Sequence, residues 1–168
     1  MVNPEVIYKK LISLLDNCHV EYKLFTHRPA LTYDELAVIQ AEVGFLGTEM
    51  KCLVMKADEN FIVYITLQGQ RVDYQVIAER VGGKKVRLAT PEELLEHFGA
   101  TPGCAYPFGF DASYDIYVDP TIYKEEWLLF SPVVPTQTVQ ARGADLKKAF
   151  DALENHISEV SNFNQPVA

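Results

Sequence analysis

The chain contains 168 residues, of which 48% are hydrophobic and 11% aromatic. A chain of this size supports one domain with a substantial core and buries roughly two thirds of its unfolded surface. Its formal net charge of -8 argues against a broad surface that coats nucleic acid, because such surfaces are basic. The negative net charge is still compatible with a small local patch that binds only the end of a nucleic acid.

No apolar run approaches the ~18 residues of a membrane-spanning helix. The N-terminal stretch MVNPEVIYKK lacks the basic-then-apolar order of a signal peptide. We therefore expect a cytoplasmic protein without a membrane partner. The cysteines Cys18, Cys52 and Cys104 are far apart and form no CxxC pair, which argues against a disulfide framework or a zinc site. The sequence predicts neither a metal nor a cofactor.

The first half of the chain contains several helix and turn signals. Asn3 followed by Pro4 is typical of a helix start. The stretch TYDE at 32–35 has the pattern of a capping box, so a second helix is expected up to about Glu42. The other elements expected here are a strand over 20–26, a hairpin formed by 50–57 and 61–67 around Asp58-Glu59-Asn60, and a short helix from Asp73 to a stop at Gly82-Gly83.

The second half alternates short strands with two helices. The stretch TPEE at 90–93 combines an N-cap, a proline in the first turn and a capping-box glutamate, and its helix is expected to end at Gly99. Apolar periodicity predicts a last helix from Ala144 to about Val160, with Leu146, Ala149, Phe150, Leu153 and Ile157 on its inner face. Strands are expected over 86–88, 115–119, 127–130 and 136–140.

The interleaved strands and helices predict the fold class. Their connections are irregular and often too short for regular βαβ crossovers. We expect a single α+β domain over residues 1–160, with a mixed, strongly curved β-sheet surrounded by helices. Residues 161–168 have little to anchor them and are expected to form a flexible tail.

The strand at 50–57 carries a lysine at each end of its apolar run. Side chains alternate along a strand, so Lys51 shares a face with Leu53 and Met55, while Lys56 points to the opposite side. A buried ammonium must reach solvent, pair with an acid or meet an anionic ligand. Lys56 lies beside a turn and fits a solvated strand end. Lys51 follows Gly47-Thr48, which suggests a close-packed turn that opens into a cleft.

The stretch TPGCAYPFGF at 101–110 is rich in proline and glycine. Such a loop is stiff and presents backbone N–H groups in fixed directions, as a site for a carbonyl or an oxyanion requires. The same composition also occurs in an ordinary tight connection, so the loop alone does not decide between the two interpretations.

These two stretches and their neighbours resemble the YbaK family, which includes the editing domain inserted in bacterial prolyl-tRNA synthetases and its free-standing relatives. The resemblance runs from about His27 to Phe150, and its parts occur in the family's order. The parts are MKCLVMK at 50–56, FIVYITLQGQRVDYQVIAERVGGKKVRLATPEEL at 61–94, GCAYPFG at 103–109, IYVD at 116–119 and TVQARGADLKKAF at 138–150. The ordered set is more specific than any one of its motifs.

The resemblance implies a free-standing deacylase that acts in trans on the ester between a wrong amino acid and the 3′-terminal adenosine of a tRNA. Carried over to this chain, Lys51 is the essential lysine and holds the tRNA 3′ end. Gly103 and Pro107 bound the loop that orients the aminoacyl group. The substrate-binding positions that follow are Cys104, Ala105, Tyr106, His27 and Thr138.

The same resemblance implies the partner and the chemistry. The partner is the aminoacylated acceptor end of a tRNA, with an aminoacyl-tRNA synthetase as a candidate presenter. Alanine or cysteine on proline tRNA is the family's usual substrate. The ribose 2′-hydroxyl, rather than a protein side chain, is thought to help activate the water. This agrees with the lack of a Ser-His-Asp motif, metal-ligand spacing or paired catalytic carboxylates in the sequence.

Several residues depart from the family pattern and leave the substrate open. Ser131-Pro132 stands where the family often has Ala-Gly, and Thr138 lies near a position that is acidic in some relatives. Cys52 follows the lysine where some alanine-specific relatives have asparagine. The bulky ring of Tyr106 stands where small residues are common, so it either narrows the pocket or turns outward.

Two other interpretations keep the pocket but change its use. A binding module would sense an aminoacyl-adenosine, a nucleotide or a tRNA end without hydrolysing it, and the departures favour this. A third interpretation is hydrolysis of another small ester or amide. His27 lies just before the second expected helix and could help line the cleft, but a histidine near a loop is more often structural or solvated. Cys104 has no partner histidine at a recognisable spacing, which argues against a cysteine nucleophile. The sequence does not predict the oligomeric state.

Overall fold

The structure is a computed structural model that describes residues 1–82 and 85–160. Its helices are α1 (Pro4–Asn17), α2 (Tyr33–Val43), α3 (Tyr74–Val81), α4 (Pro91–Phe98), the 3-10 helix η1 (Pro120–Lys124) and α5 (Gly143–Asp151). Its strands are β1 (Tyr22–Thr26), β2 (Thr48–Ala57), β3 (Asn60–Leu67), β4 (Val86–Leu88), β5 (Asp115–Val118), β6 (Trp127–Phe130), β7 (Gln137–Arg142) and β8 (Ile157–Glu159). The expected tail at 161–168 and Gly83 of the expected helix stop lie outside the described residues.

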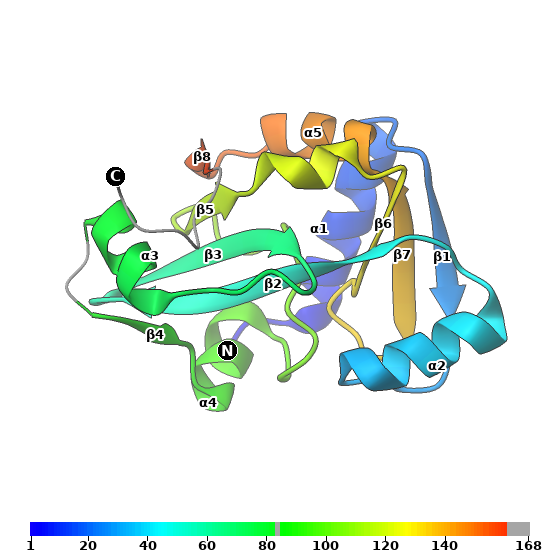
Figure 1. Cartoon of the computed structure of the whole chain (residues 1–168), viewed down its shortest axis with the longest axis horizontal. Helices are drawn as coiled ribbons and strands as arrows, with labels where there is room; N and C mark the ends of the chain where they lie inside the picture. The colour runs from blue at the N-terminus through cyan, green and yellow to red at the C-terminus, as the bar shows by residue number, and fades with distance from the viewer. Residues whose placement is uncertain (83–84, 161–168) are drawn as a thin grey trace.

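The strands form one mixed sheet in the order β1-β7-β6-β2-β3-β5-β8, with β4 paired to β2. The pairs β2–β6, β3–β5 and β5–β8 are parallel, and the others are antiparallel. The ladder between β2 and β6 contains only Thr48 and Glu49 of β2. The sheet bends at this short ladder, so that β1, β6 and β7 run across the direction of β2 and β3 (Figure 1). The prediction of an α+β domain with a mixed, curved sheet is confirmed.

Helices cover both faces of this sheet. The largest hydrophobic cluster joins α1, α4 and α5 to one face and includes Leu11, Phe98 and Phe150. A smaller cluster on the other face of β2 and β3 contains Ile77 of α3, and a third contains Ile39 of α2. Because β2 contributes to both of the first two clusters, its alternate side chains pack in opposite directions, as the sequence predicts.

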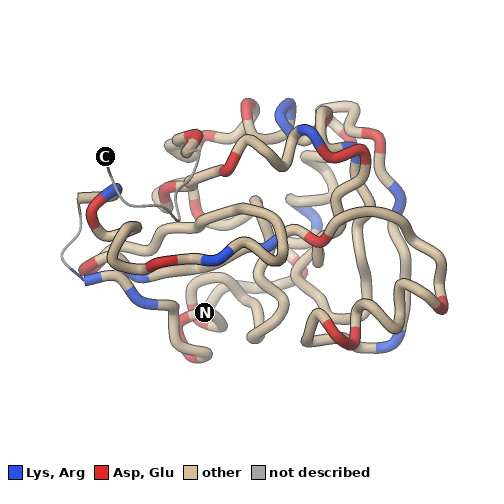
Figure 2. Tube along the Cα trace, in the orientation of Figure 1, with Lys and Arg blue, Asp and Glu red and all other residues tan. Residues whose placement is uncertain are grey.

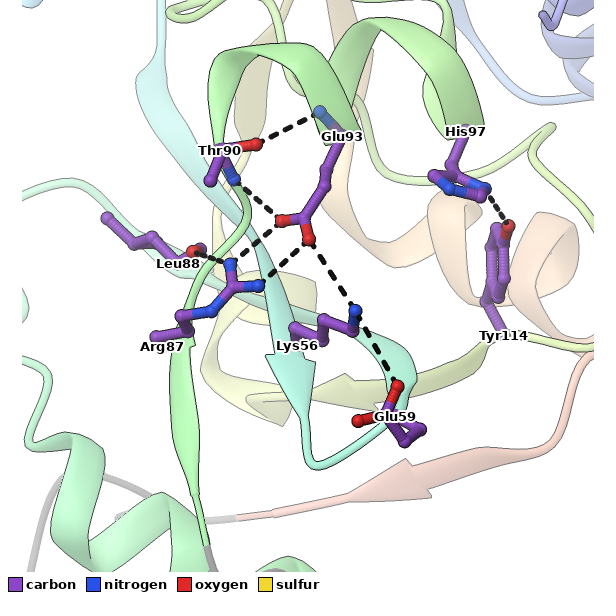
Figure 3. A network of polar contacts seen from close by, with 8 residues as sticks. All are labelled: Lys56, Glu59, Arg87, Leu88, Thr90, Glu93, His97 and Tyr114. Carbon is purple, nitrogen blue, oxygen red and sulfur yellow. Dashed lines mark hydrogen bonds and ion pairs between the residues drawn. The ribbon is translucent and has the colours of Figure 1, made fainter.

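The far end of β2 is held by a polar network around Glu93 (Figure 3). Thr90 and Glu93 form the expected capping box at the start of α4. The Glu93 carboxylate also accepts two hydrogen bonds from Arg87, each 2.8 Å long, and lies 3.6 Å from the Lys56 Nζ. Lys56 pairs with Glu59 as well, at 3.9 Å. Lys56 is therefore an ion-paired strand end rather than a pocket residue.

This network predicts acid sensitivity. The hydrogen bonds from Arg87, followed by the backbone N–H of Thr90, lower the pKa of Glu93 to about 2. A carboxyl with a depressed pKa contributes stability that is present above its unfolded pKa and is lost as the pH falls toward the folded value. We expect Glu93→Gln to lower the melting temperature at pH 6 and to flatten its decline between pH 5 and pH 2. Parallel melting curves for the two proteins would contradict this assignment.

Two sequence-based predictions are wrong in detail. The last helix does not extend to Val160, because α5 ends at Asp151 and β8 follows, with Ile157 paired to Ile116 of β5. The expected capping box of α2 is incomplete. The Thr32 side chain accepts from the Glu35 N–H, but the Glu35 carboxylate accepts from the Leu31 N–H at 2.7 Å rather than from that of Thr32.

Candidate functional site

One side of β2 has a gap in its strand pairing. On its other side β3 covers Met50 to Ala57 without interruption. On the side with the gap, β6 pairs only with Thr48 and Glu49, and β4 pairs only from Met55 onward. Residues 50–54 therefore form a length of strand edge without a partner strand, between two ladders, which we call the open edge of β2.

Backbone groups of alternate residues point to this open edge. The Met50 carbonyl accepts from the Tyr33 hydroxyl at 3.5 Å, and the Val54 carbonyl accepts from the Ala89 N–H at 2.9 Å. Along a strand, the backbone N–H and C=O groups of successive residues point alternately to one edge and to the other. Met50, Cys52 and Val54 therefore point to the same edge, and the residues between them point to β3. The N–H and C=O of Cys52 therefore face the open edge. An unpaired strand edge is a ready site for a ligand with its own donors and acceptors.

A pocket of about 240 Å³ lies along the open edge. It brings together the two stretches that the sequence singles out, because Lys51 lines it together with Gly103 and Ala105 of the proline- and glycine-rich loop. The remaining lining residues are Leu31, Thr32, Tyr33, Leu36, Glu49, Met50, Cys52, Leu53, Phe130 and Ser131. A second hollow of about 260 Å³ shares Cys52, Leu53, Gly103 and Ala105 with the first and continues toward α4.

Lys51 supplies positive charge at the rim of this pocket. Its Nζ donates to the backbone carbonyl of Gln70, at 3.0 Å, in the turn after β3. None of the ion pairs within the described residues involves Lys51. An ammonium has three N–H donors, so those not used by Gln70 remain for an anionic ligand. Lys51 therefore has the geometry of an unneutralised, solvent-facing cation.

Gly103 lets the loop approach the start of α2. Its φ of +88° lies in the left-handed region that favours glycine. A Cβ at this position would collide with the backbone carbonyl of Leu31. Leu31 is itself fixed by the hydrogen bond from its N–H to Glu35. The close contact between Gly103 and Leu31 closes one wall of the pocket, which no other residue type would permit.

Glu49 is a pocket residue that sequence reasoning missed. Its Oε1 is buried and, among the described residues, has no hydrogen-bond partner. Burial raises the pKa of Glu49 to about 7. The signal in the sequence is an acid two residues before Lys51 in the same strand, which places both side chains on the same face.

The buried carboxyl predicts an unusual pH dependence of stability. Because the pKa of Glu49 is higher in the folded state, the folded protein binds more protons than the unfolded chain, and its stability falls as pH rises from about 4.5 to 7. Glu49→Gln removes this fall. By pH 8 we expect the variant to be more stable by about 3 kcal/mol, at about 1.4 kcal/mol per pKa unit. Urea unfolding at pH 5 and pH 8 measures the difference, and an equal change in both proteins would contradict the prediction.

Comparison with known proteins agrees with this arrangement. The model of the family described as "Aminoacyl-tRNA editing domain" matches residues 27–149, which include Lys51 and the loop. The chain belongs to the aminoacyl-tRNA editing domain family. This confirms the relationship predicted from the sequence.

Two relatives of this editing domain have names that describe tRNA deacylation or tRNA editing. The chain is 27% identical over 128 residues to "Multifunctional Ser/Thr-tRNA deacylase ProXp-y" of Escherichia coli (strain K12), covering 74% of this chain and 75% of that protein. It is 23% identical over 150 residues to "Prolyl-tRNA editing protein ProX" of Acetoanaerobium sticklandii, covering 86% and 91%. These names confirm the prediction of an aminoacyl-tRNA hydrolase family.

A longer relative and a solved structure extend the comparison. Over 92 residues the chain is 34% identical to "Proline--tRNA ligase" of Bacillus pumilus, but the match covers 52% of this chain and only 16% of the ligase. A crystal structure described as a proposed trans-editing enzyme for prolyl tRNA synthetase shares the fold, with a TM-score of 0.69 at 18% identity. That match covers 96% of this chain and 99% of the other.

Three predicted site residues of the editing-domain loop lie in the core instead of the pocket wall. Cys104, Tyr106 and Pro107 are buried, and none of them is among the described residues that line the pocket. The Tyr106 hydroxyl donates to the Phe98 carbonyl at 2.6 Å. Its ring therefore neither narrows the pocket nor turns outward, the two positions considered from the sequence. Burial also raises the pKa of the Cys104 thiol, which disfavours a thiolate nucleophile.

His27 and Thr138 contact one another, but neither is among the described residues lining the editing-domain pocket. The carbonyl of Arg28 lies 2.7 Å from His27 Nδ1 and can only accept, so Nδ1 carries the proton. Nε2 lies 2.7 Å from the Thr138 hydroxyl and, in the neutral imidazole, accepts from it. The hydrogen bond between His27 and Thr138 connects the segment before Leu31 with strand β7. It therefore supports the pocket wall from behind.

The turn after β6 contributes the part of the pocket wall that lies beside the loop, because the Ser131 side chain contacts Cys104. Ser131 lines the pocket, and its hydroxyl donates to the Val134 carbonyl at 2.8 Å. Val133 has a φ of +77°, which is rare for a β-branched residue and indicates a constrained turn. Of the two residues that depart from the family pattern here, Ser131 thus lies on the pocket wall, whereas Pro132 is not among the described residues that line it.

Charge around the editing domain is mixed. Figure 2 shows basic and acidic residues interspersed along the described trace. Lys51 is the one lysine or arginine among the described residues that line the pocket. None of the helices in the described part of the chain combines the length and apolar character that a membrane span requires.

Proposed function

We propose that this chain is an aminoacyl-tRNA deacylase that acts in trans, in the cytoplasm, on mischarged tRNA. The observation that carries the proposal is that Lys51, Gly103 and Ala105 line one pocket on the open edge of β2. The names of the relatives, a Ser/Thr-tRNA deacylase and a prolyl-tRNA editing protein, support this class of reaction.

In the proposed reaction water attacks the ester carbonyl carbon that joins the amino acid to the terminal ribose. The bond from that carbon to the 3′ oxygen breaks, the 3′ oxygen takes a proton, and free amino acid and tRNA leave. The neighbouring 2′-hydroxyl of the substrate assists the water. No pocket side chain has to act as a nucleophile in this scheme.

Two groups of the chain are proposed to position the ester. Lys51 holds the phosphate and ribose of the 3′ end, because a compact ammonium with unused donors suits a phosphodiester. The Cys52 N–H on the open edge, together with the backbone at Gly103 and Ala105 of the rigid 103–107 loop, orients the aminoacyl carbonyl. Fixed backbone donors stabilise the charge that develops on a carbonyl oxygen.

The walls of the pocket favour a small amino acid. Leu31, Leu36 and Phe130 limit its apolar side, while Ser131 and Cys52 differ from the family pattern. We propose alanine or cysteine on proline tRNA as the first substrates to test. Serine and threonine come next, because one relative is named a Ser/Thr-tRNA deacylase.

The test is amino-acid release from alanyl-tRNA(Pro) at excess protein, combined with a filter-binding measurement on the same substrate. A deacylase releases alanine faster than buffer alone. A non-catalytic module that only senses aminoacyl-tRNA ends retains the charged tRNA without releasing alanine. Release from a simple alanine ester at the same rate as from the tRNA would favour a general esterase instead.

A further inference from the structure

The pocket contains an acidic and a basic side chain that do not pair with each other. Glu49 and Lys51 are two residues apart on β2, so their side chains share a face. None of the ion pairs within the described residues joins them, and the Lys51 ammonium turns instead to the Gln70 carbonyl. The hydrogen bond of the Lys51 ammonium is exposed, whereas the Oε1 of Glu49 is buried in the same pocket.

Among the described residues, none donates a hydrogen bond to the buried Oε1 of Glu49. The other titratable residues that line the pocket are Tyr33, Lys51 and Cys52. The Tyr33 hydroxyl is directed to the Met50 carbonyl, and burial raises the pKa of Tyr33 and of the Cys52 thiol, so both stay neutral. Burying a carboxylate without a hydrogen-bond donor costs free energy. When such a carboxylate lines a binding pocket, the ligand normally supplies the missing donor.

We propose that Glu49 binds the α-ammonium group of the aminoacyl substrate. The inference rests on the proposed deacylase function and adds a recognition role to the same site. In an aminoacyl ester, the ammonium lies on the carbon next to the ester carbonyl. Binding of that ammonium by Glu49 at the end of the open edge holds the carbonyl near the Cys52 N–H. Lys51 then meets the phosphodiester on the other side of the ester.

The arrangement makes the charge pattern of the pocket complementary to that of the substrate. An aminoacyl-tRNA end carries a cation at the amino acid and an anion at the phosphate, in the same order as Glu49 and Lys51. The raised pKa of Glu49 supports this role, because an approaching ammonium favours the ionised carboxyl and removes the cost of leaving it unpaired. Acylation of the substrate's amino group removes its positive charge, so the Glu49 carboxyl has no ammonium to pair with.

The experiment compares alanyl-tRNA(Pro) with N-acetyl-alanyl-tRNA(Pro) as substrates of wild type, Glu49→Gln and Glu59→Gln. Glu59 is a matched control, since its exposed side chain lies at the opposite end of β2. We expect wild type and Glu59→Gln to prefer the free amino group by at least about tenfold in kcat/KM, a difference of about 1.4 kcal/mol. In Glu49→Gln the preference falls to within about twofold, through loss of activity on the free substrate. Circular dichroism checks that each variant is folded.

Each result separates the recognition role from the deacylase itself. If Glu49→Gln retains the wild-type preference, Glu49 does not bind the ammonium, although the deacylase proposal stands. If the folded variant loses activity equally on both substrates, Glu49 serves the chemistry rather than recognition, which also overturns the inference. If wild type releases alanine from neither substrate, while serine, threonine and cysteine esters are equally stable, the proposed function fails and this inference fails with it.

Discussion

Lys51→Ala is expected to lower kcat/KM for the mischarged tRNA by at least about 100-fold, equivalent to about 2.7 kcal/mol of transition-state stabilisation. The physical reason is that Lys51 is the one lysine or arginine among the described pocket-lining residues, and it has donors left for the tRNA 3′ end. Its single hydrogen bond to Gln70 is exposed, so folding stability should change by no more than about 0.5 kcal/mol. Single-turnover deacylation and thermal melting measure the two quantities.

Lys56→Ala is the matched control for this prediction. It removes an ammonium from the same strand, but one that pairs with Glu93 and Glu59 outside the pocket. We expect a lower melting temperature and a kcat/KM within about threefold of wild type. Equal activity losses in Lys51→Ala and Lys56→Ala would mean that general charge, rather than the position of Lys51, governs activity.

Gly103→Ala is expected to cost more than about 3 kcal/mol of folding stability and to reduce deacylation even where the protein is folded. A left-handed φ disfavours alanine by about 1–2 kcal/mol. Here the new Cβ also meets the Leu31 carbonyl, which is backbone and cannot rotate away. The loop must therefore move off the start of α2, and the wall that Gly103 and Leu31 form must open.

Gly44→Ala is the control that separates the cost of a left-handed φ from the cost of the collision with Leu31. Gly44 ends α2 with a φ of +91°, and a Cβ there has nothing within 4 Å. This variant should lose only the conformational term of about 1–2 kcal/mol and retain wild-type activity. Urea unfolding of both variants gives the difference that is due to the contact with Leu31. Similar losses for Gly44→Ala and Gly103→Ala would show that this contact is unimportant.

The fold could be predicted largely from local signals, and the errors have local causes. Caps and turn residues located most elements, including α4 with its capping box at Thr90 and Glu93. The last helix was extended too far because Ile157 continues the helical periodicity, and no glycine or proline marks the end of α5. Strand β8 is stabilised by its pairing with β5, and the apolar periodicity of the sequence carries no information about such a tertiary contact.

The site could be predicted only in part for a similar reason. Family resemblance located Lys51 and the loop, but it did not say which loop residues face the pocket. Gly103 and Ala105 line it, whereas Tyr106 packs in the core, because its hydroxyl reaches the Phe98 carbonyl. Glu49 was missed, because its burial depends on the short ladder with β6 that no local pattern reveals.

The central claim is that this chain hydrolyses mischarged tRNA. The most direct measurement is release of labelled amino acid from tRNA(Pro) charged with alanine, cysteine, serine, threonine or proline, at excess wild-type protein. We expect rapid release of at least one of the small non-cognate amino acids and slow release of proline. Unchanged half-lives for all five esters, with the charged tRNA nonetheless bound, would contradict the claim and leave a binding module in its place.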